Sequence, residues 1–247
     1  MIHFLDVDTK VDHGYSERDR FYMNFYTGDD SYKSTSKESK DIKEADVFRW
    51  RWGNLIGSAN WSYVFNRTLF SNFTIGYSRY RSRITQTKNE FNFPGEGKPK
   101  HVRFQQNSYH SNVQDVSFRA DLDYRPHRKH RIRMGTDYRL HLFMPESDHL
   151  KYWYKDSEIT QHKDTVYANH RIQGHELSVY VEDEMSPSNR LSINIGMRHT
   201  LFQVKSKSYH SFQPRISARY LIMPELSAKV SYSKMNQYIH QLSNSYI

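Results

Sequence analysis

Hydrophobic and polar residues alternate along most of the chain, most clearly in residues 111–142. The polar segment 125–129, which contains Pro126, divides this region into two arms, so we predict two antiparallel strands joined by a turn. A period of two places successive side chains on opposite faces. One face is densely charged. The apolar face carries Val116, Phe118, Ala120, Leu122 and Tyr124 on the first arm, and Ile132, Met134, Thr136, Tyr138, Leu140 and Leu142 on the second.

The charged face predicts how the two arms pair. With residues 125–129 as the loop, three opposite-charge pairs face each other: Asp123 with Arg131, Asp121 with Arg133, and Asp115 with Arg139. Facing opposite charges stabilise a strand pair, and a one-residue slip would move every carboxylate to the apolar side. This register is a hypothesis that the observed strand pairing tests.

The same pattern predicts about ten strands and no helix. They cover residues 1–12, 20–26, 54–65, 69–84, 111–124, 130–142, 172–185, 191–204, 212–221 and 226–234. Short turns follow alternate strands, whereas the other connections are longer: residues 27–53, 85–110, 143–171 and 205–211. In a meander, alternate connections lie on the same edge of the sheet. Long loops at one end and tight turns at the other are typical of outer-membrane barrels.

The composition supports a wall with one wet face. The 247 residues have a mean hydropathy of −0.90, yet 15% are aromatic, which is far too many for a disordered chain. No apolar run approaches the roughly 20 residues of a membrane helix. We therefore predict an all-β antiparallel meander of about ten long strands that forms part of a transmembrane β-barrel. A soluble sandwich also alternates, but its strands are usually shorter, about 5–6 residues.

Charge and residue chemistry exclude several other classes of function. The 36 Lys and Arg residues are interspersed with 27 Asp and Glu, so the net charge of +9 does not indicate a nucleic-acid partner. The absence of cysteine excludes disulfides and thiolate metal sites. His127 and His130 are three residues apart across a turn, which is not a metal-binding pattern. We predict no metal, no cofactor and no catalytic residues, and hence no enzyme.

Several segments carry a family resemblance: Gly196-Met197-Arg198, Gln213–Tyr220 (QPRISARY), Ser231–Ser245 (SYSKMNQYIHQLSNS), Arg49–Asn54 (RWRWGN) and residues 71–81. They resemble the barrel of TonB-dependent outer-membrane receptors, and the resemblance spans essentially the whole chain. It implies a barrel of about 22 strands filled by an N-terminal plug. Such a receptor takes up an iron chelate, cobalamin or a glycan with energy relayed by TonB.

The resemblance also implies the partners and the place of the protein. They are outer-membrane lipid, the plug, the remaining barrel strands, TonB acting through that plug, and a small-molecule or glycan ligand. The chain shows no signal peptide, TonB-contacting box, plug or aromatic-ended last strand. We therefore expect residues 1–247 to be a partial barrel, located in the cell outer membrane as part of a full-length receptor.

Two groups of residues are candidates for ligand contact. Aromatic residues in the predicted extracellular loops are the first, and they also fit an interfacial girdle or loop packing: Tyr109, His110, Tyr152, Trp153, Tyr154 and Tyr167. Charged residues predicted to face the lumen are the second: Arg119, Arg131, Arg133, Arg139, Asp115, Asp121 and Asp123. The arginines would guide an anionic substrate, meet the plug, or pair with these aspartates across strands.

Two other functions remain open from the sequence. The chain could form a small autonomous outer-membrane barrel acting as an enzyme or adhesin, which requires its first and last strands to pair. Alternatively, it could be a soluble β-sandwich that binds carbohydrate through its loop aromatics. The sequence does not name the transported substrate.

Overall fold

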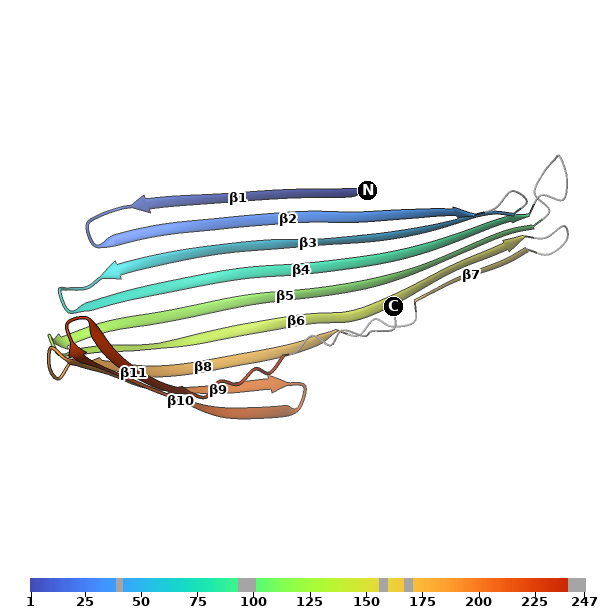
Figure 1. The fold of residues 1–247 in the computed structure, drawn as a ribbon. Coiled ribbons are helices and arrows are strands. Elements are labelled where there is room, and N and C mark those ends of the chain that lie inside the picture. The colour runs from blue at the N-terminus through green and yellow to red at the C-terminus, as the bar shows by residue number, and fades with distance from the viewer. Residues whose placement is uncertain (39–41, 93–100, 156–159, 167–170, 240–247) are drawn as a thin grey trace.

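The computed structural model describes residues 1–38, 42–92, 101–155, 160–166 and 171–239, and they form one antiparallel sheet of eleven strands (Figure 1). The strands are β1 (Ile2–Gly14), β2 (Asp19–Glu38), β3 (Ile42–Val64), β4 (Leu69–Asn92), β5 (His101–His127), β6 (His130–Lys155), β7 (Thr160–Val166), β8 (Ile172–Met185), β9 (Leu191–Val204), β10 (Lys207–Met223) and β11 (Leu226–Ser233). Strands β1 to β6 pair in sequence order, and so do β8 to β11. On its other side, β6 pairs with β8 through residues 130–143 and with β7 through residues 149–155. The predicted all-β meander is confirmed. The described residues contain no helix that could cross a membrane.

The strands are longer than predicted at one end of the sheet. Most of residues 27–53 and 85–110, and much of 143–171, were predicted as loops but continue the strands β2 to β6. The short turns that follow alternate strands nevertheless lie together, as predicted, at the end of the sheet opposite these strand extensions (Figure 1). Residues 205–211 also differ from the prediction, because a two-residue turn at Lys205 with a φ of 52° starts β10 at Lys207.

The predicted register of β5 and β6 is wrong by two residues. The turn occupies only Arg128 and Lys129, and an irregularity follows Tyr124 before His127 pairs with His130. The observed partners are Asp123 with Arg133, Asp121 with Gly135, and Asp115 with His141. A shift of two residues keeps every side chain on its predicted face, because the strand period is two. The predicted division into an apolar and a charged face therefore survives the error.

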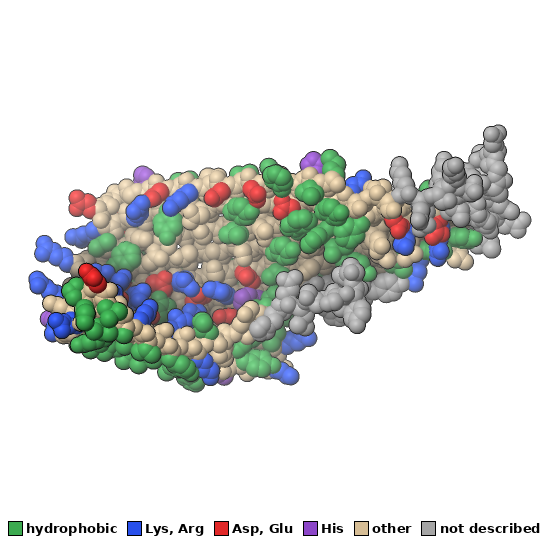
Figure 2. Space-filling view, viewed as in Figure 1, with side chains coloured by type: hydrophobic (Ala, Val, Ile, Leu, Met, Phe, Trp, Pro, Cys, Tyr) green, Lys and Arg blue, Asp and Glu red, His purple; other side chains and the backbone are tan. Residues whose placement is uncertain are grey.

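The apolar face forms a continuous band across the sheet. On β4 it runs from Leu69 to Tyr77, and on β5 from Val116 to Tyr124, which pair with each other. Nine residues at about 3.3 Å each span roughly 30 Å, and a tilted strand of this length matches an apolar band about 25 Å tall. Val179, Val181, Ile195 and Met197 are 45–50% exposed on this face. Figure 2 shows hydrophobic side chains along the outside of the β9–β11 region.

The sheet is a single layer. Phe202 is the one buried hydrophobic residue among those that the structure describes. A β-sandwich buries the apolar faces of two sheets against each other, so the soluble carbohydrate-binding alternative is wrong. In the described chain β1 pairs only with β2 and β11 only with β10. The closure that an autonomous barrel requires is therefore not formed.

Candidate functional site

The second face of the sheet, which we call the charged face, lines the hollow seen in Figure 2. All seven charged residues predicted to face the lumen lie on this face, as the strand pairs show. Asp137 lies at the centre, opposite Arg119 on β5. Its carboxylate accepts hydrogen bonds from Arg119 at 2.7 Å and Arg139 at 3.2 Å, and Arg198 lies 3.8 Å away. Asp137 is 3% exposed.

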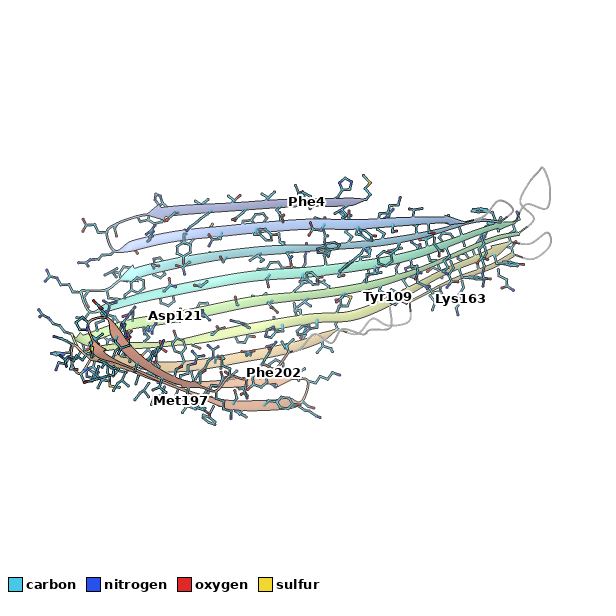
Figure 3. The ribbon with its side chains drawn as sticks, viewed as in Figure 1. Phe4, Tyr109, Asp121, Lys163, Met197 and Phe202 are labelled. Atoms are coloured by element: carbon cyan, nitrogen blue, oxygen red, sulfur yellow. The ribbon has the colours of Figure 1, made fainter. Side chains whose placement is uncertain are left out.

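Two further clusters flank this centre. Towards the short turns, Asp123 pairs with Arg131 at 2.5 Å and Arg133 pairs with Glu182 at 2.8 Å. Towards the long hairpins, Nδ1 of the buried His141 lies 2.7 Å from an oxygen of Asp115. On the short-turn side, Tyr180 donates a hydrogen bond to Asp121, which Figure 3 labels near that end of the sheet.

Every one of the four predicted arginines has a carboxylate partner. Arg119, Arg131 and Arg133 pair across strands, which is the alternative to guiding an anion, whereas Arg139 pairs with Asp137 on its own strand. Of these partners only Asp123 is one of the predicted aspartates, because Arg119 and Arg139 contact Asp137 and Arg133 contacts Glu182. Arg131 does contact Asp123, on a diagonal rather than directly opposite. The network holds four neighbouring strands together through charges on one face.

The predicted aromatic residues do not form one site. Tyr109 and His110 lie on β5, and Tyr152, Trp153 and Tyr154 lie on β6, so these five are strand residues rather than loop residues. Tyr167 lies outside the described residues. Trp153 and His110 share one face, and the three tyrosines share the other. Tyr109 and Tyr152 are also far apart along the sheet. Tyr152 pairs with Gln105, which is four residues from Tyr109 on β5, a separation of about 13 Å.

His110 instead takes part in the pairing of the long β4–β5 extension. Nε of Arg83 donates a hydrogen bond to Nδ1 of His110 at 3.2 Å. Burial, followed by the charges of Arg83 and His149, lowers the pKa of His110 below its usual value of 6.5. The neutral ring is thus favoured in the folded extension. The neutral ring of His110 contributes its full stabilisation above the ordinary histidine pKa. This stabilisation is lost as the pH falls through the lowered pKa of His110 in the folded protein.

We therefore expect acid to loosen this extension. Protease cleavage within β4–β5 above the apolar band should accelerate as the pH falls from about 7 to about 5, the range in which histidine titrates. The His110→Gln variant keeps an acceptor but does not titrate, so its cleavage rate should stay flat. A His149→Gln variant is the control and should retain most of the pH response. Equal pH profiles for the wild type and His110→Gln would contradict the assignment.

A group of aromatic residues that the sequence analysis missed lies on the charged face beyond the network. We call it the aromatic patch: Tyr32, Phe48, Trp50, Trp52 and Tyr109. Strand pairing aligns Tyr32, Trp50, Ile84 and Tyr109 in one row. The rings of Trp50 and Trp52 lie 4.5 Å apart, and Nε1 of Trp50 donates a hydrogen bond to Ser82 at 3.0 Å.

The aromatic patch is accessible. Tyr32 and Trp50 are each 37% exposed, and Figure 2 shows hydrophobic side chains gathered in this part of the hollow. The sequence could have placed these tryptophans on the charged face. Trp50 and Trp52 are separated from Asn60 by even numbers of residues along β3, so all three side chains lie on the same face. Most of residues 27–53 lack an apolar alternation, so the sequence predicts a loop there and no face for these rings. Of the predicted aromatic residues, only Tyr109 joins this patch.

A single-layered antiparallel sheet with an apolar band on one face and paired charges on the other is the wall of a transmembrane β-barrel. Residues 4–242 match the family model described as "TonB dependent receptor-like, beta-barrel". The chain belongs to this family. It is accordingly an outer-membrane protein of a receptor family, and not an enzyme. No curated protein matches the chain.

Solved structures share the fold at low sequence identity. The Pseudomonas aeruginosa receptor FpvA, in a complex with a heterologous pyoverdine and iron, is 10% identical with a TM-score of 0.54. The FpvAI–pyocin S2 complex is 11% identical with a TM-score of 0.52. The matches cover 93% and 94% of this chain but only 37% and 38% of those chains. The chain therefore spans well under half the length of the receptors that it resembles.

Proposed function

We propose that residues 1–247 are part of the barrel of a receptor that takes up a scarce nutrient with energy supplied through TonB. The observation that carries this proposal is the open edge at each side of a wall that matches the receptor family. Unpaired strand edges are not tolerated in lipid, because their backbone groups have no hydrogen-bond partners there. The remaining strands of a receptor would pair with β1 and β11, and a plug would fill the lumen that the charged face borders.

The balanced charges of this face suit contact with a plug. Because each of the four arginines contacts a carboxylate, the network offers polar contacts whose positive charge is partly neutralised. TonB would act on the plug, not on these strands. Outer-membrane lipid would contact the opposite, apolar face.

The aromatic patch supplies the ligand-binding surface in this proposal. Exposed tryptophan and tyrosine rings offer a large apolar area at a low entropic cost, and they stack on flat or ring-shaped ligands. This chemistry suits an iron chelate, cobalamin or a glycan. The pyoverdine–iron complex held by FpvA supports placing iron chelates first among them.

Uptake assays in the native host test the proposal. We expect deletion of the gene that encodes this chain to abolish accumulation of one labelled ligand from these three classes. Loss of TonB alone should abolish the same accumulation but leave binding to the cell surface intact. The control is re-expression of the complete gene, which should restore both. Unchanged accumulation of all three ligand classes in the deletion strain would contradict the proposal.

A further inference from the structure

Five arginines gather on the apolar face immediately beyond the apolar band. On β4 the band ends at Tyr77, and the next three positions on the same face are Arg79, Arg81 and Arg83. On β3, Arg51 lies directly opposite Arg83, and Arg49 is the next residue on that face. We call these five residues the arginine row. It lies on the side of the long hairpins, which in outer-membrane barrels is the extracellular side.

The arginine row is poorly neutralised. Among the described residues of β2 to β5, a single carboxylate, that of Asp29, lies on this part of the face, and it contacts Arg51 at 2.8 Å and Arg81 at 2.9 Å. Arg83 bonds to the ring of His110 rather than to an acid. Arg49 and Arg79 have no carboxylate partner in the described part of the chain. This differs from the charged face, where each arginine of the network is paired.

The geometry of the arginine row suits an anion. Like charges directly opposite each other, as in Arg51 and Arg83, destabilise a strand pair unless something between them is negative. The side chains of Arg51 and Arg81 are 59% and 52% exposed, so their remaining N–H groups are accessible. Guanidinium groups bind phosphate in a bidentate manner and lose little solvation in doing so.

We propose that the arginine row binds the phosphate groups of a phosphorylated glycolipid of the lipid A class in the outer leaflet. Such a lipid has two parts, and each meets a matching surface: its acyl chains lie along the apolar band, and its phosphates reach the arginines just above it. Basic clusters next to an apolar membrane segment are a general means of binding anionic lipid headgroups. The inference does not depend on which nutrient the receptor transports.

Native mass spectrometry of the complete receptor, purified from outer membranes in detergent, tests the proposal. Bisphosphorylated lipid A should bind the wild-type barrel about tenfold more tightly than the dephosphorylated lipid, as two charge-assisted contacts suggest. The Arg79→Gln/Arg83→Gln variant should remove that difference, and Arg79→Lys/Arg83→Lys should keep part of it. The control Lys88→Gln/Arg103→Gln loses the same charge from the opposite face of β4 and β5 and should bind like the wild type.

Two results would overturn the proposal. The first is equal binding of the phosphorylated and dephosphorylated lipids by the wild-type protein, which would show that the acyl chains alone are recognised. This comparison needs no variant, so it holds even if a substitution prevents assembly. The second is an equal loss of binding in the control variant, which would show that only the overall charge of the protein matters.

Discussion

Replacing Asp137 by asparagine is expected to destabilise the folded barrel by about 3 kcal/mol, since removing one partner of a buried ion pair leaves the others uncompensated. Asp137 is 3% exposed, and three arginines converge on its carboxylate: Arg119, Arg139 and Arg198. The amide has nearly the same shape as the carboxylate but carries no charge, so packing is preserved while three cations lose their anion. Urea-induced unfolding of the complete receptor in detergent, followed by tryptophan fluorescence, measures the change.

Asp12 provides the matched control for this substitution. It forms a similar bidentate pair with Arg20, but at the short-turn end where both side chains are accessible. Exposed pairs contribute little to stability, so Asp12→Asn should unfold at the same urea concentration as the wild type. Adding Arg119→Gln to Asp137→Asn should recover part of the loss, because the double variant removes one of the stranded cations. Equal stability of Asp137→Asn and Asp12→Asn would show that the network does not stabilise the wall.

The two faces of the sheet could be predicted from the sequence because side-chain parity is a local property. In residues 111–142 the alternation alone separated Phe118 and Leu122 from Asp121 and Asp123, and the structure keeps that division. The register could not be predicted from charge, because registers two residues apart keep the same faces and bring opposite charges within reach. Arg131 bonds to Asp123 in the observed register without lying opposite it. The tight turn at Arg128–Lys129 and the irregularity between Tyr124 and His127 together set the register.

The candidate site was harder to predict because its strands extend beyond the membrane. Within lipid one face must be apolar, which produces the alternation used to find strands. Beyond Tyr77 on β4 both faces meet water, so residues 85–92 can pair with β5 without any apolar pattern. The sequence therefore predicts loops where the strands continue. A predicted loop gives no face for the tryptophans of the aromatic patch. For the same reason, Tyr152 and Tyr154 are predicted in an extracellular loop, whereas they lie on strand β6 away from the patch.

The Trp50→Ala/Trp52→Ala variant is expected to weaken ligand binding by about 30-fold, or roughly 2 kcal/mol, which is the cost of truncating a central aromatic contact. The two rings lie 4.5 Å apart on the charged face, and Trp50 is held by its hydrogen bond to Ser82. Both substitutions enlarge an already open surface, so the barrel should still assemble. Equilibrium binding of the labelled ligand identified by the uptake assay, measured on intact cells that lack TonB, isolates recognition from transport.

Trp61→Ala separates loss of a binding surface from loss of a tryptophan. Trp61 lies on the same strand, β3, but on the apolar face, where it stacks on Phe73 at 5.5 Å. Its removal should leave ligand affinity unchanged, although it reduces the apolar contact of the wall with lipid. If Trp61→Ala weakens binding as much as the double variant does, the effect is one of barrel assembly. If the Trp50→Ala/Trp52→Ala variant retains full affinity, recognition lies with strands of the receptor that this chain does not supply.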